Sequence, residues 1–68
     1  MPQVFVSPEE IATFLGVSGT SVRRWIKQGQ LRAYRAGDRY LVRLQDLASF
    51  LGITLGQLVE DWNYWRSG

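Results

Sequence analysis

The chain has 68 residues, a formal net charge of +2, no cysteine and no histidine. This length corresponds to one small domain, and the two missing residue types exclude disulfides, zinc fingers and histidine-based catalysis. No apolar run approaches the roughly 20 residues that span a bilayer, so we expect no membrane location. The cysteine-free composition is typical of a cytoplasmic protein. We expect no cofactor.

The charges are distributed unevenly along the chain. Between Arg23 and Arg43 there are seven cations and one acid, whereas the two ends together hold one cation and five acids. A basic centre of this kind indicates a polyanionic partner. The acidic ends are suited to contact another protein or the basic surface of a second copy of the chain.

The first predicted element is a helix over residues 8–15, preceded by a short apolar segment at residues 4–6. Ser7 fits the N-cap and Glu10 the third position of a capping box, with a proline at the first helical position. Gly16 provides the stop. The proline, glutamine and acids near the start of the chain do not form a secretory signal. The buried stripe is expected to consist of Ile11, Phe14 and Leu15.

A second helix is predicted from an N-cap at Ser18 to a stop at Gly29. Its apolar stripe consists of Val22, Trp25 and Ile26, and its opposite stripe of Thr20, Arg23, Arg24 and Lys27. A three-residue turn containing Gly16 joins the two helices, which is a helix-turn-helix arrangement. Three cations on one helical face suit a phosphate-lined groove. A merely solvated surface helix is the alternative interpretation.

After Gly29 the apolar residues change from helical to alternating spacing. Two runs, residues 31–35 and 39–43, flank a glycine-containing turn and predict a β-hairpin. Arginines recur along it at positions 32, 35, 39 and 43. A cationic hairpin after a recognition helix is the wing of a winged helix, and arginine at its tip suits the minor groove. Strand arginines can also simply cover the sheet.

Two further helices complete the chain, one over residues 45–51 that ends at Gly52 and one opened by a capping box at Thr54. The buried residues of the first are expected to be Leu47, Phe50 and Leu51, and the apolar stripe of the second is Leu55, Leu58, Val59, Trp62 and Trp65. Leu58, Trp62 and Trp65 either close the core or form an exposed patch that meets a protein partner. The expected organisation is one domain over residues 1–68, with a core at 1–52 and a C-terminal helix and tail at 53–68.

Six stretches carry a family resemblance in unbroken order: Ser7-Pro8-Glu9-Glu10-Ile11-Ala12, Leu15-Gly16-Val17-Ser18, Thr20 to Ile26, Gly29 to Arg35, Gly37-Asp38-Arg39-Tyr40 and Asp46 to Leu51. They resemble the excisionase-type, MerR-like winged-helix DNA-binding domain. The resemblance implies a mainly α fold with a small β-hairpin, whose second helix enters the major groove while the wing follows the minor groove. It implies DNA contacts by Thr20, Ser21, Arg23, Arg24, Lys27, Arg35, Arg39 and Tyr40.

The same resemblance implies a non-enzymatic protein that binds and bends DNA beside a phage attachment site and assists an integrase in excision. We therefore expect duplex DNA, an integrase and further copies in head-to-tail contact as partners, in the cytoplasm of a bacterial host. Without the long dimerising helix and effector domain of MerR regulators, a ligand-sensing activator is not expected. A small repressor and a protein-interaction adaptor stay as alternatives. The scattered acids form no catalytic pair, so no enzyme is expected.

Overall fold

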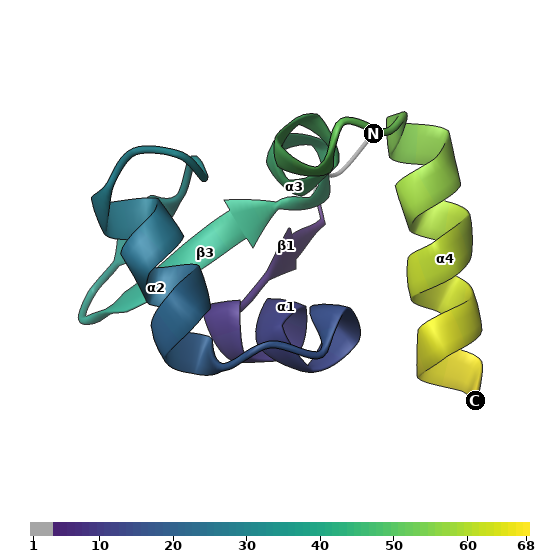
Figure 1. Cartoon of the computed structure of the whole chain (residues 1–68), viewed down its shortest axis with the longest axis horizontal. Coiled ribbons are helices and arrows are strands. Elements are labelled where there is room, and N and C mark those ends of the chain that lie inside the picture. The colour runs from purple at the N-terminus through teal and green to yellow at the C-terminus, as the bar shows by residue number, and fades with distance from the viewer. Residues whose placement is uncertain (1–3) are drawn as a thin grey trace.

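The computed structural model describes residues 4–68, and within this range four helices surround a three-stranded antiparallel sheet (Figure 1). Residues 1–3, the start of the segment expected to lack a secretory signal, lie outside the described residues. The elements are β1 Phe5–Val6, α1 Pro8–Leu15, α2 Gly19–Lys27, β2 Tyr34–Ala36, β3 Arg39–Arg43, α3 Leu44–Leu51 and α4 Leu55–Ser67. The predicted winged helix-turn-helix fold with a C-terminal helix is confirmed.

The helix ends largely follow the capping chemistry of the sequence. Ser7 and Glu10 form both hydrogen bonds of a capping box, at 3.1 and 3.0 Å, and Gly16 ends α1 with a φ of 74°. At α4 only half of the predicted box forms: the Gln57 N–H donates to the Thr54 hydroxyl, but the Gln57 side chain donates to Asp61 and does not accept from the Thr54 N–H. α2 ends at Lys27, two residues before the predicted stop at Gly29.

The sheet contains one strand more than the predicted hairpin. β3 lies between β2 and β1, and β1 pairs with it so that Phe5 faces Arg43 and Val6 faces Val42. The sequence predicts only an apolar segment at residues 4–6, because a two-residue strand is too short to show an alternating pattern. Its strand character comes from pairing with a segment far along the chain.

The first strand of the hairpin is shorter than predicted. The N–H of Leu31 donates to the carbonyl of Trp25 at 3.1 Å, and the Leu31 side chain is buried. This contact holds the chain after α2 in an irregular turn, so β2 begins only at Tyr34. The β2–β3 turn has a positive φ at Gly37 and not at Asp38, which are the φ signs of a type II′ turn.

The core draws on all four helices, on β1 and β3, and on the segment after α2. Its buried members are Val6, Ile11, Ala12, Val22, Leu31, Val42, Leu44, Leu47, Ala48, Leu58 and Trp62. Several predicted core residues pack around this cluster as half-buried side chains: Phe14, Leu15, Trp25, Ile26, Phe50, Leu51, Val59 and Trp65. The aromatic residues at this rim allow a chain of only 68 residues to bury a useful apolar area.

The C-terminal helix is part of this core, so Leu58 and Trp62 close the core, as in the first of the two predictions, and do not form the exposed interaction patch of the second. Leu58 is fully buried, and the ring centroids of Trp62 and of Phe14 in α1 lie 4.7 Å apart. Trp65 is half-buried beside the same phenylalanine, at 5.4 Å between ring centroids. Leu58 and Trp62 therefore belong to the core. Of the three residues of the predicted patch, Trp65 alone is partly exposed to solvent.

Within residues 4–68, no helix is both long enough and apolar enough to cross a membrane.

The longest helix of this range, α4, has 13 residues and is capped at its start by Thr54, whose hydroxyl accepts from the Gln57 N–H at 3.1 Å. Near the other end of α4, Arg66 forms an ion pair with Glu10 of α1, with 2.9 Å between Nη1 and Oε2. α4 is thus tied to α1 by both apolar and charged contacts.

We expect Leu58→Ala to lower the free energy of unfolding by about 2–5 kcal/mol, because it removes a fully buried side chain from the core. Leu55 on the same helix is 44% exposed, so Leu55→Ala should change the free energy by less than about 1 kcal/mol. Urea unfolding followed by circular dichroism measures both. Equal losses in the two variants would contradict the packing of α4 through Leu58.

Candidate nucleic-acid interface

α2 is held by its ends and by its apolar stripe. The Ser18 hydroxyl accepts from the Ser21 N–H at 3.2 Å, and the two hydroxyls share a hydrogen bond at 3.0 Å. Val22 is fully buried, and Trp25 lies 5.0 Å from Phe50 of α3 between ring centroids. The opposite stripe of α2 therefore faces away from the core. Ser21, predicted to contact DNA, is half-buried and has a capping role in this structure.

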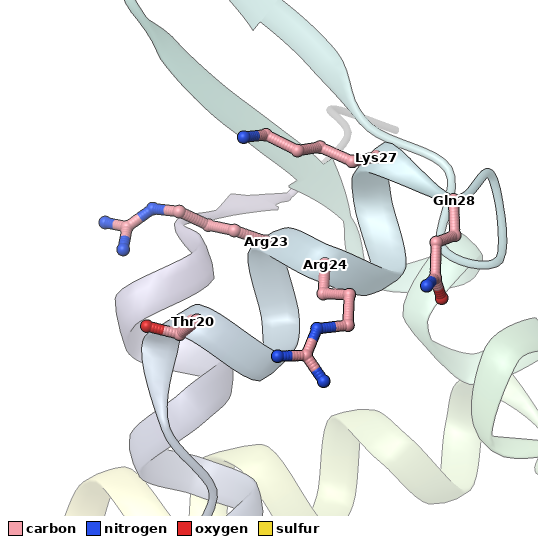
Figure 2. Close-up of a pocket in the computed structure, with 5 residues that line it drawn as sticks. All are labelled: Thr20, Arg23, Arg24, Lys27 and Gln28. Carbon is pink, nitrogen blue, oxygen red and sulfur yellow. The ribbon is translucent and has the colours of Figure 1, made fainter.

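The outward stripe lines a shallow, open hollow formed by Thr20, Arg23, Arg24, Lys27 and Gln28 (Figure 2). Figure 2 shows Arg23 and Lys27 extending to one side of the helix, and Arg24 and Gln28 to another. The stripe predicted from the sequence does not include Gln28, because its i, i+3, i+4, i+7 spacing from Thr20 ends at Lys27. The position of Gln28 one turn after Arg24 is the pattern that could have found it.

Arg23 is the one cation of this hollow that has an acidic partner within residues 4–68. Its guanidinium forms an ion pair with Glu9 in the first turn of α1, and both side chains are well exposed, at 49% and 60%. In the same range, Arg24 and Lys27 have no ion pair and no side-chain hydrogen bond, and both are exposed. Two cations of α2 are thus free to meet a polyanion, and a third is shared with α1.

The predicted wing residues lie on the hairpin, outside this hollow. Arg35 and Tyr40 face each other across β2 and β3, and the Arg35 guanidinium lies 5.6 Å from the Tyr40 ring centroid. Nε of Arg35 also donates to the carbonyl of Gly37 at 3.3 Å. Arg39 is exposed, and the described residues offer its side chain no hydrogen bond or acidic partner. Arg35 therefore stabilises the β2–β3 hairpin, which is the wing. Arg39, at the turn of this hairpin, is a cation without a partner among residues 4–68.

Arg43 has a structural role at the base of the hairpin. Its guanidinium donates two hydrogen bonds to Asp46 of α3, at 2.8 and 3.1 Å, and lies 5.1 Å from the Tyr34 ring centroid. The hydrogen bonds that Arg43 donates to Asp46 raise the pKa of Arg43 above its ordinary value, against a smaller opposing effect of burial. This pair joins β3 to the first turn of α3, so Arg43 is occupied within the fold.

The whole structure places the cationic elements at one end. In Figure 1, α2 and the β2–β3 turn lie at the same end of the long axis, and α4 lies at the opposite end. A helix with outward cations beside a hairpin with an arginine at its turn has the parts of a winged-helix reader of duplex DNA. The geometry thus agrees with the role expected for α2 and the hairpin.

Comparison with known proteins gives the family. Residues 5–52 match the model of a helix-turn-helix domain, so α4 lies outside the matched segment. The chain is also 49% identical to an excisionase of Mycobacterium phage D29 over 45 residues, which cover 66% of this chain and 77% of the phage protein. No solved structure matches the chain significantly. The chain therefore belongs to the excisionase family of DNA-binding helix-turn-helix proteins.

Proposed function

We propose that this protein recognises duplex DNA sequence-specifically through α2 and the β2–β3 hairpin, bends attachment-site DNA, and assists an integrase in excisive recombination. The observation that carries this proposal is the outward face of α2, where Arg24 and Lys27 are exposed and have no acidic partner within residues 4–68. The 49% identity to a phage excisionase supports the biological role. In this role the protein acts in the bacterial cytoplasm and performs no covalent chemistry itself.

The side chains of α2 divide into base readers and phosphate binders in this proposal. Arg24 and Gln28 extend together on one side of the helix (Figure 2), and arginine pairs with guanine as glutamine pairs with adenine in the major groove. Lys27 is a compact point charge, and Thr20 lies in the first turn of α2, so both suit phosphate oxygens. A single module of this size is expected to bury about 600–1,000 Å² on DNA.

In this proposal the wing bends the DNA, and the end of the molecule that carries α4 contacts other copies of the protein. Arg39 at the turn enters or borders the minor groove, where arginine is favoured by the negative potential and bending brings more DNA into contact. The cations of α2 and the exposed acids of α4 lie at opposite ends (Figure 1). This separation favours head-to-tail contacts between copies. The solvent-facing part of Trp65 is the remaining member of the predicted patch that could meet integrase.

We expect Arg24→Ala to weaken binding to a cognate attachment-site duplex by about 1–3 kcal/mol, and by less on random DNA, because a base contact is lost. For the wild type, neutralisation of about four phosphates gives a slope of log affinity against log salt near −4. Fluorescence anisotropy across a salt series measures both quantities. Arg66→Ala is the matched control, since it removes the same charge from α4. Equal effects of the two variants would argue against α2 as the reader.

Arg39→Ala should weaken binding to cognate and random duplexes by a similar factor and make the salt slope shallower by about 1, because the wing contacts the backbone. The same anisotropy series provides the test. Asp38→Asn, at the adjacent turn position, removes a negative charge and should shift affinity in the opposite direction. A loss confined to one DNA sequence in Arg39→Ala would instead assign this arginine to base recognition.

Excision itself is tested with a cognate integrase and a plasmid that carries the recombined attachment sites. We expect recombination to depend on the protein, to be lost in Arg24→Ala, and to be accompanied by bending in a circular-permutation assay. Promoter repression without any effect on recombination would instead identify a transcriptional repressor. Duplex binding that is unchanged in a double Arg24→Ala and Arg39→Ala variant would indicate a protein-interaction adaptor.

A further inference from the structure

The ion pair between Glu9 and Arg23 joins α1 to the DNA-facing side of α2. Nη1 of Arg23 lies 3.5 Å from the position that a Cβ at Gly19 would occupy, so the guanidinium lies near the first turn of α2. In Figure 2, Arg23 reaches out from α2 on the same side as Lys27. The carboxylate of Glu9 is therefore placed at the guanidinium that would otherwise meet a DNA phosphate.

The fold makes little use of this carboxylate. Glu10, the neighbouring acid, accepts from the Ser7 N–H with one oxygen and pairs with Arg66 through the other. The Glu9 side chain, within residues 4–68, has Arg23 as its one polar partner. An exposed ion pair of this kind contributes little to stability, because solvent screens it and two long side chains are ordered. Its position on the DNA-facing side is thus better explained by binding than by folding.

We infer that Glu9 substitutes for a DNA phosphate at Arg23 and so weakens binding to DNA of arbitrary sequence. This inference rests on the proposed DNA-binding face of α2. A carboxylate and a phosphate oxygen compete for the same donor geometry of arginine. Arg23 must leave Glu9 before it binds phosphate, so the loss of this ion pair opposes binding to DNA. Glu9 therefore lowers affinity for the sequence-independent part of the DNA, which supplies non-specific binding.

A purely positioning role for Glu9 makes the opposite prediction. If Glu9 held Arg23 in the orientation that binds phosphate, removing its charge would release the guanidinium and weaken binding. The competitive role predicts tighter binding when the charge is removed. The sign of the change in affinity therefore separates the two roles.

The test compares Glu9→Gln with Glu60→Gln, an exposed glutamate on α4 that has no ion pair within residues 4–68. Both variants raise the net charge equally, so general attraction to DNA is matched. Anisotropy with a short random-sequence duplex is measured across a salt series. We expect Glu9→Gln to bind about two- to fivefold more tightly than Glu60→Gln. Thermal melting of both variants verifies that they are folded.

The Arg23→Ala background completes the design. There, Glu9→Gln should give no gain over Glu60→Gln, since the competing partner is absent. Affinity of Glu9→Gln equal to or below that of Glu60→Gln would overturn the inference, and so would a gain that persists without Arg23. Lys27→Ala reports on the proposed function separately. If it weakens binding while Glu9→Gln has no effect, only the inference fails, whereas random-duplex binding that Lys27→Ala leaves unchanged contradicts the DNA-binding face itself.

Discussion

The burial of one stripe of α2 is the constraint on which the rest of the interface depends. Val22 is fully buried, and Trp25 packs against Phe50 of α3, so the helix cannot rotate about its axis without exposing apolar surface. Because successive stripes of a helix are linked by its 3.6-residue period, this burial places Arg24 and Lys27 on the outside. The orientation of the proposed DNA-binding face is thus set by packing on the other side of the same nine-residue helix.

The fold also decides which cations are free to bind DNA. Arg43 and Arg66 are held by Asp46 and by Glu10, so that two of the eight cations link elements of the fold. Arg23 is shared between α1 and the α2 face. A net charge of +2 therefore understates the polarity of the molecule, because Asp46 and Glu10 pair with arginines outside the α2 face and the wing turn.

α4 explains how so short a chain closes its core. The match to the helix-turn-helix family ends at residue 52, and α4 begins at Leu55. Trp62 and Leu58 then cover apolar surface of α1 and α3 that the preceding elements leave uncovered. A domain near the lower size limit gains much of its stability from such large side chains, since its surface is large relative to its volume.

The sequence by itself determined the local features: the helix starts at Ser7 and Ser18, the order of the elements, and the outward stripe of α2. These depend on capping hydrogen bonds and on helical periodicity, which involve residues three or four positions apart. Tertiary structure alone decided that the segment containing Val6 pairs as a strand, that Trp62 is buried and that Glu9 meets Arg23. Each of these joins residues from different elements, and no local pattern encodes which distant partner a side chain meets once the chain is packed.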